Sequence, residues 1–148
     1  MSVIEMLEAD HVRIRSLFSD IEGTDEPEEL QDYFDKLDNF LTIHARAEEL
    51  VLYPQSRNCR DTVELIDKGQ EQHAKGEQMV LEIKSTSSNS SEFKEKLGEL
   101  QKFMLNHLDE EENELFPKVR ECLDDEKLEE LATQLKETKS SVVKKVVD

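Results

Sequence analysis

The sequence contains little of what sheets and tight turns require. Its 148 residues include four glycines, three prolines and no tryptophan. Because glycine and proline mark turns and interrupt helices, their scarcity favours an all-α protein, as does the abundance of Leu, Glu and Lys. A chain of this length is the size of one ordinary domain and can bury a core without disulfide staples.

Long apolar runs and basic clusters are also missing. No apolar run approaches bilayer length, and no basic residue precedes the first apolar ones, so we expect a soluble, cytoplasmic protein. The formal net charge of -17 repels phosphate backbones and anionic lipid. We therefore expect neither nucleic acid nor a membrane surface as a partner, and no protein partner is indicated.

The chain does contain a segment that occurs twice, as HARAEELVLYPQSR from His44 and as HLDEEENELFPKVR from His107. In each copy a Glu follows the His by four residues. Side chains at that spacing lie one turn apart on the same helix face, so an imidazole and a carboxylate can point at one place. This spacing is typical of metal ligands.

The duplication extends to the other two histidines. His11 precedes His44 by 33 residues, and His73 precedes His107 by 34. Each half therefore predicts a helix with a lone His followed by a helix with His-x-x-x-Glu. Two such hairpins related by a pseudo-twofold axis would bring four His and two Glu together. Counting about 1.5 Å of rise per residue leaves His44 up to about two turns deeper than His11, a mismatch that the true helix ends must absorb.

Local signals set the expected helix boundaries. Four helix starts are predicted. Ser2 and Glu5 form a capping box, and Pro27 is suited to the first turn of a second helix. Asp61 and Glu64 form a second capping pair, and the serine-rich connector 85–91 precedes the fourth helix. The second helix should run to about Arg57, and the fourth should continue through Leu115. We expect a helical bundle over residues 1–122 and a C-terminal helical extension over residues 123–148.

The histidines and two of the glutamates fall on apolar stripes of these helices. An ionised carboxylate in a core seam is costly unless it is paired or bound to a cation. Glu48 and Glu111 are therefore more informative than Glu49 and Glu112, which we expect to be exposed. A lone core His is usually structural, but all four fall on such stripes in a repeated pattern. The sequence predicts one shared metal site.

The donor set restricts the metal. Four imidazoles and two carboxylates without thiolates disfavour copper(I) and iron–sulfur clusters, and they are too rich in nitrogen for calcium or magnesium. Iron, manganese or zinc remain. Two ions bridged by Glu48 and Glu111 would use every ligand, whereas one tetrahedral zinc would not. The predicted metal ligands are His11, His44, Glu48, His73, His107 and Glu111.

These motifs, with each Glu followed by a second Glu and then by Leu-aromatic-Pro, resemble the hemerythrin-like, or HHE cation-binding, domain over residues 1 to about 122. The resemblance implies an up-down-up-down four-helix bundle with a di-iron centre, oxo- or hydroxo-bridged. It also implies terminal His ligands and bridging Glu48 and Glu111. Oxygen-carrying hemerythrins have a His where this chain has Glu77. Glu77 is either a seventh ligand or, as we favour, an outer or solvated residue.

The resemblance implies binding or sensing of a small molecule, such as oxygen, peroxide or nitric oxide, or of iron itself. An alternative is a di-iron peroxidase-like or catalase-like enzyme in oxidative-stress defence, so enzymatic activity stays open. A third hypothesis is a metal-free helical interaction protein. The Glu residues in two core seams argue against it.

Five further residues leave alternatives open. Cys59 and Cys122 follow matching helix ends and should lie at the same end of the bundle, as a reversible disulfide or, as we favour, as two free thiols in a reducing cytoplasm. Gly69 and Gly76 lie four residues before and three residues after His73, on the same side of the helix. Either they leave room for a cluster or a small ligand, or they are simply tolerated helix glycines. Tyr53 is interpreted first as packing, with hydrogen bonding or electron transfer as the alternative.

Overall fold

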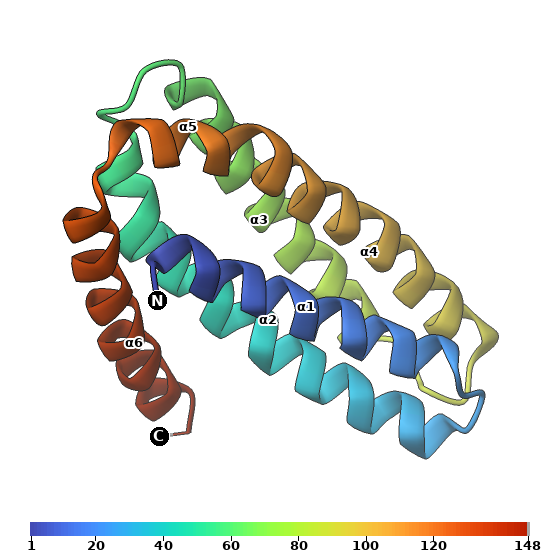
Figure 1. The fold of residues 1–148 in the computed structure, drawn as a ribbon. Coiled ribbons are helices and arrows are strands. Elements are labelled where there is room, and N and C mark those ends of the chain that lie inside the picture. The colour runs from blue at the N-terminus through green and yellow to red at the C-terminus, as the bar shows by residue number, and fades with distance from the viewer. Residues whose placement is uncertain (148) are drawn as a thin grey trace.

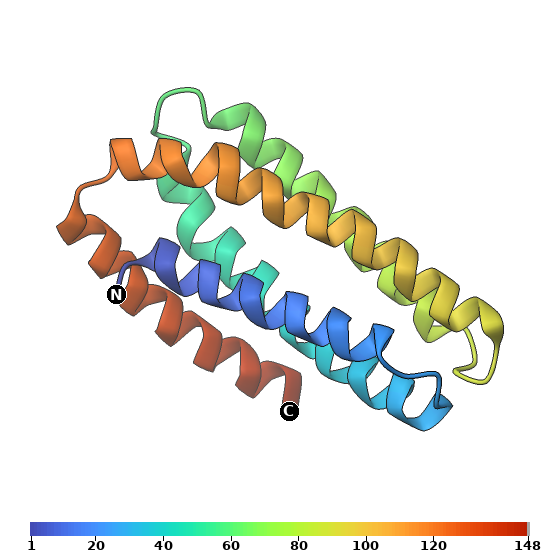
Figure 2. The same ribbon diagram turned by 45° about the vertical axis from the view of Figure 1, so that its right-hand side comes forward.

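The computed structural model describes residues 1–147, and the side chains of residues 1–143. Its helices are α1 (Val3–Glu22), α2 (Pro27–Ser56), α3 (Val63–Lys84), α4 (Ser91–Glu110), the π-helical segment η1 (Glu111–Leu115), α5 (Phe116–Cys122) and α6 (Asp125–Val147). Helices α1 to α4 run alternately up and down, and α6 lies beside α1 and α2 (Figures 1 and 2). The predicted all-α fold, a four-helix bundle with an additional C-terminal helix, is confirmed.

The helix starts follow local chemistry with one exception. Ser2 and Glu5 form the predicted capping box of α1, and Pro27 opens α2. The predicted Asp61/Glu64 cap of α3 is wrong, because Asp61 adopts a left-handed backbone with φ of 62° and Thr62 precedes the helix. The Thr62 hydroxyl instead donates to the carbonyls of Ser56 and Cys59, so it ties the start of α3 to the end of α2.

The fourth helix is interrupted where the sequence predicts a continuous one. From Glu111 the chain takes a π turn, in which the Phe116 N–H donates to the Glu111 carbonyl five residues back. A π turn holds one residue more than an α turn and thus rotates the following side chains relative to the preceding ones. The change of geometry begins at one of the predicted metal ligands.

The apolar core consists of two clusters, one at each end of the bundle. The α6-end cluster combines the start of α1, the end of α2, α5 and α6, and includes Leu7, Val51, Leu52, Phe116, Leu131 and Leu135. The far-end cluster includes Ile14, Phe18, Phe34, Leu41, Phe93 and Leu108. His11 lies between Leu7 and Ile14 along α1, so the predicted site falls in a polar layer between the two clusters.

The two cysteines form a disulfide, so the favoured interpretation of two free thiols is wrong. The bond joins Cys59 in the α2–α3 loop to Cys122 at the end of α5, with a Cα–Cα distance of 5.6 Å. The proximity follows from the bundle topology, because α2 and α4 run in the same direction and their C-terminal ends meet. The bond therefore connects the two halves of the repeat.

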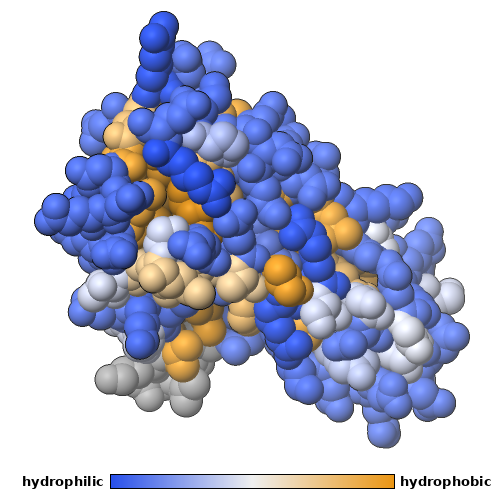
Figure 3. Space-filling view, in the orientation of Figure 1, coloured by the Kyte–Doolittle hydropathy of each residue, from blue (hydrophilic) through white to orange (hydrophobic). Residues whose placement is uncertain are grey.

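One face of the molecule can be judged by its hydropathy. The face seen in Figure 3 is mostly hydrophilic, with apolar side chains showing in separate places. Within residues 1–147, no helix combines the length and the apolar character needed to cross a bilayer.

Candidate metal centre

The bundle brings all six predicted ligands to one place between the two apolar clusters. His11 comes from α1, His44 and Glu48 from α2, His73 from α3, His107 from α4 and Glu111 from η1. Each is buried, with at most 8% of its surface exposed. The rings of His11 and His44 lie 5.2 Å apart, centroid to centroid, so the helices absorb the mismatch in depth that residue counting suggests.

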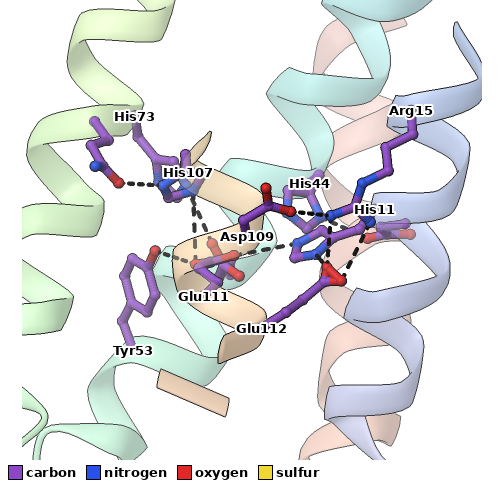
Figure 4. A network of polar contacts seen from close by, with 12 residues as sticks. His11, Arg15, His44, Tyr53, His73, His107, Asp109, Glu111 and Glu112 are labelled. Atoms are coloured by element: carbon purple, nitrogen blue, oxygen red, sulfur yellow. Dashed lines mark hydrogen bonds and ion pairs between the residues drawn. The ribbon is translucent and has the colours of Figure 1, made fainter. Parts of the chain in front are cut away.

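The six residues form two overlapping groups. His11 and His44 make one group with Glu48 and Glu111, and His73 and His107 make the other with the same two carboxylates. Within each group the candidate ligand atoms lie within 4.8 Å of one another. Figure 4 shows Glu111 between the two pairs of histidines. The arrangement can hold two cations that share both carboxylates.

Each imidazole is oriented by a hydrogen bond on its outer nitrogen. The Nδ1 atoms of His44 and His107 lie 2.8 Å from Asp10 and 2.5 Å from Gln72. Those of His11 and His73 each lie 3.3 Å from a carboxylate oxygen, of Glu112 and Glu49 respectively. Because these oxygens accept, Nδ1 carries the proton in the neutral form of each imidazole, and Nε2 then keeps its lone pair. All four Nε2 atoms are buried without a hydrogen-bond partner in the described part of the chain.

The outer side chains follow the internal repeat. Asp10 and Gln72 each precede the lone His of their half, and each accepts from the His of the next helix. Glu49 and Glu112 each follow a candidate bridging Glu. The expectation that they are exposed is wrong: their side chains are half-buried, 31% and 24% exposed, because they contact histidines of the opposite half. The repeated Glu-Glu pair was the sequence signal for this role.

Two aromatic side chains complete the repeat. Phe116 stacks on His11 and Tyr53 stacks on His73, each with ring centroids 5.7 Å apart. Tyr53 also donates a 2.7 Å hydrogen bond from its hydroxyl to Glu111 Oε2. It is therefore both a packing residue and a hydrogen-bond donor to the centre. Phe116 lacks a hydroxyl, so the two halves differ here.

Gly69 provides the space that Tyr53 needs. A Cβ at Gly69 would lie 2.5 Å from the Tyr53 hydroxyl oxygen, closer than such contacts allow. This glycine therefore makes room for a residue of the cluster, which was one of the two interpretations left open. At Gly76 a Cβ would lie 3.1 Å from Met104 Sδ, at the wall of a cavity.

Burial and close charges set the protonation of the carboxylates. Burial, reinforced by repulsion from Glu111, raises the pKa of Glu48. Burial also opposes ionisation of Glu111, but the adjacent imidazoles of His11 and His107 outweigh it and lower the Glu111 pKa. One carboxylate of the pair is thus favoured as the anion, because two adjacent buried anions repel each other in the metal-free protein.

The pKa values of two histidines shift in opposite directions. Burial lowers the pKa of His73, but the adjacent carboxylates of Glu48 and Glu49 raise it to about 10. Burial, with repulsion from the other histidines, lowers the pKa of His107 to about 4 although Glu111 opposes the change. The carboxylates thus favour positive charge at His73, whereas repulsion among the imidazoles favours a neutral His107.

A cavity of about 210 Å³ opens between α2 and α3 and reaches the centre. His44 and His73 line it, one from each group of candidate ligands, together with apolar Leu41, Val80 and Met104. Glu77 lies on its wall and is exposed, and it belongs to neither ligand group among the described residues. This position agrees with an outer or solvated residue.

The fold and the centre define a class: a four-helix bundle with buried His and Glu ligands for metal cations. The chain matches the hemerythrin HHE cation-binding domain over residues 2–119 and belongs to the hemerythrin family. It is accordingly a cation-binding protein.

Comparison with individual proteins agrees with this family. The chain is 33% identical over 145 residues to a protein named DNA nickase from Nostoc sp., covering 96% of this chain and 40% of that protein. It is 25% identical over 135 residues to an uncharacterized hemerythrin-like protein of Schizosaccharomyces pombe, covering 90% and 66%. The chain thus spans less than two thirds of the length of either relative.

A solved structure shows the same fold. The crystal structure of a hemerythrin HHE cation-binding domain-containing protein from Mycobacterium kansasii matches with a TM-score of 0.82 and 24% identity. The match covers 99% of this chain and 92% of that one.

Proposed function

We propose that this protein is a non-haem di-iron protein that binds or senses a small molecule at a carboxylate-bridged dinuclear centre. The ligand would be oxygen, peroxide or nitric oxide, or the protein would respond to iron itself. The observation that carries the proposal is the set of four buried, unpartnered Nε2 atoms facing two shared carboxylates.

The residues fit a pair of metal ions better than they fit a metal-free core. Buried polar atoms are normally hydrogen bonded, and eight buried side-chain atoms in the described residues are not. Seven of these belong to the six candidate ligands: the four imidazole Nε2 atoms, both oxygens of Glu48 and one of Glu111. A bound cation would satisfy such atoms and offset the two buried carboxylate charges.

The donor chemistry supports iron over the alternatives. Imidazole and carboxylate without thiolate suit iron, and two positions that share Glu48 and Glu111 suit a dinuclear site better than one tetrahedral zinc. When bound, iron would supply redox chemistry and a coordination position for a small ligand. The chain itself orients the imidazoles through Nδ1 and keeps water from most of the site.

The cavity between α2 and α3 supports a small ligand. Its volume of about 210 Å³ is below that of drug-sized ligand pockets, and its lining combines His44 and His73 with apolar Leu41, Val80 and Met104. A diatomic molecule or peroxide would fit this cavity and reach the centre by this route.

The test is the metal content and ultraviolet–visible spectrum of the purified protein and of two variants. We expect about two irons per chain and near-ultraviolet charge-transfer absorption in the wild type. Glu111→Ala should lose most of both, because it removes a carboxylate that belongs to both ligand groups. Glu114→Ala, an exposed position in the same η1 segment, should retain both. One zinc, or no metal, in the wild type would contradict the proposal.

A second candidate function is turnover of peroxide, as a peroxidase-like or catalase-like enzyme. It is favoured by Tyr53, an oxidisable phenol whose hydroxyl donates directly to Glu111. The iron-loaded protein would then consume hydrogen peroxide far in excess of its own concentration. Consumption limited to about one equivalent per centre would favour binding or sensing.

We do not extend the activity of the Nostoc relative to this chain. The match covers 40% of that protein, and the activity in its name belongs to the whole protein. A formal net charge of -17 also opposes binding of a phosphate backbone. We therefore keep nucleic acid outside the proposal.

A further inference from the structure

The C-terminal helix contributes a side chain to the candidate centre. Lys139 of α6 donates from Nζ to Asp10 Oδ2 at 2.5 Å, and the same oxygen accepts from His44 Nδ1 at 2.8 Å. A continuous chain of hydrogen bonds thus runs from α6 through α1 to an imidazole on α2. Figures 1 and 2 show α6 running beside these two helices.

Lys139 is held in place. Its side chain is 23% exposed, and its ammonium group lies 6.0 Å from the ring centroid of Phe40. Earlier in α6, Leu128, Leu131 and Leu135 belong to the α6-end cluster and fix the helix against α1 and α2. The ammonium therefore reaches Asp10 from a helix that is anchored to the bundle.

The second half of the repeat has no equivalent of this ion pair among the described residues. There the outer partner of His107 is Gln72, a neutral amide, whose own N–H donates to Glu110. The nearby cation in this half is Lys68, whose side chain is 54% exposed and whose ammonium contacts Glu110, not Gln72. A carboxylate acceptor raises the basicity of an imidazole ligand more than an amide does. The two candidate metal positions are therefore unequal.

We propose that Lys139 is a positioning residue that holds Asp10 against His44 and so makes the His11/His44 position the tighter of the two metal positions. This inference rests on the proposed dinuclear centre. It assigns α6, which lies outside the matched family domain, a role in metal binding.

Two effects of Lys139 oppose each other. Its positive charge repels a cation in the centre, and its hydrogen bond orients the acceptor that orients His44. Asp10 lies between Lys139 and His44, so its negative charge offsets much of the repulsion between the Lys139 ammonium and a cation in the centre. The orienting effect should prevail, and removal of the ammonium should weaken metal binding rather than strengthen it.

The experiment is a titration of the metal-free full-length protein with Co²⁺, followed by visible absorption and by calorimetry. The wild type should bind two ions. Lys139→Met, which keeps an apolar stem over Phe40, should lose roughly tenfold in affinity for one ion, at the low end of the effect of outer ligand partners. Lys139→Arg should recover most of that loss because it keeps the charge and the N–H donors. Lys136→Met, an exposed lysine earlier on the same helix, controls for the charge change.

The outcomes separate the inference from the proposed function. If the wild type binds fewer than two Co²⁺ ions, the dinuclear centre fails and the inference fails with it. If the wild type binds two and Lys139→Met binds both equally well or more tightly, the inference alone is overturned. Loss in Lys136→Met of the same size as in Lys139→Met would also overturn it. Thermal unfolding of each metal-free variant shows whether the fold is kept.

Discussion

Every histidine of this chain is held by a hydrogen bond at its outer ring nitrogen. The outer Nδ1 atoms are paired with Asp10, Glu49, Gln72 and Glu112, and the inner Nε2 atoms face the two buried glutamates. Such pairing fixes the tautomer before any cation arrives, because an acceptor on Nδ1 leaves the lone pair on Nε2. The site is therefore organised by residues next to the ligands in sequence.

At the residue scale, Tyr53 gives a test of the hydrogen bond to Glu111. Tyr53→Phe removes the hydroxyl donor and leaves a buried carboxylate oxygen with one partner fewer. We expect the free energy of unfolding of the metal-free protein to fall by about 1–3 kcal/mol, the usual effect of unpairing a buried charged acceptor. Denaturant titration measures the change.

The chain offers a matched control for this variant. Tyr33 is the other tyrosine, half-buried against the far-end cluster, with the Lys36 ammonium 5.8 Å from its ring centroid. Tyr33→Phe should change the free energy of unfolding by less than about 0.5 kcal/mol, as most surface substitutions do. Equal effects of the two variants would mean that the Tyr53 hydroxyl contributes nothing specific.

At the element scale, the helices carrying the ligands contain glycines with opposite roles. Gly69 of α3 faces the Tyr53 hydroxyl, and Gly98 of α4 has no described atom within 4 Å of the position of an added Cβ. Glycine weakens a helix by about 1 kcal/mol relative to alanine. Gly69 is thus required by packing, whereas Gly98 only lowers the helix propensity of α4.

Alanine at these two positions should therefore act in opposite directions. Gly98→Ala should stabilise the protein by up to about 1 kcal/mol through helix propensity alone. Gly69→Ala should destabilise it, because the new Cβ and the Tyr53 oxygen cannot both keep their places. Thermal unfolding of the two variants compares them. Stabilisation by Gly69→Ala would show that Tyr53 moves without cost and that the tight contact is not required.

The π turn of η1 is the other special feature at this scale. It begins at Glu111, whereas the matching Glu48 lies within the regular helix α2. The two halves of the repeat thus present equivalent carboxylates from different backbone geometries. Insertions of this kind often occur at functional sites, where they redirect side chains.

At the scale of the whole molecule, the disulfide joins distant parts of the chain into one covalent loop. Cys59 and Cys122 are 63 residues apart, and a loop of that length corresponds to about 4 kcal/mol of stabilisation in the chain-entropy description. Cys122 is exposed, so a reductant can reach the bond. Reduction should lower the midpoint of thermal unfolding of the wild type.

The control is the double variant Cys59→Ser with Cys122→Ser. It should unfold at the temperature of the reduced wild type and should not respond to reductant. If reduction leaves the wild-type midpoint unchanged, the bond does not constrain the unfolded chain as this description requires. Metal content measured in parallel shows whether the end of the bundle that carries the disulfide also supports the centre.

The sequence by itself determined the fold class and the six candidate ligands. Both follow from short-range regularities, since the 3.6-residue period marks helix faces and His-x-x-x-Glu places two donors on one face of one helix. The internal repeat then related the two His-x-x-x-Glu faces, and the two faces with a lone His, by symmetry. These properties survive uncertainty in the helix ends because they depend on spacing within single elements.

The tertiary structure alone decided what depends on distant elements meeting. The relative depth of His11 and His44, the pairing of Cys59 with Cys122 and the contact of Lys139 with Asp10, 129 residues away, require the actual placement of one helix against another. A shift of one helical turn moves a side chain by about 5.4 Å, further than any hydrogen bond reaches. Periodicity in the sequence does not set that register, because it is decided by the packing of the two apolar clusters.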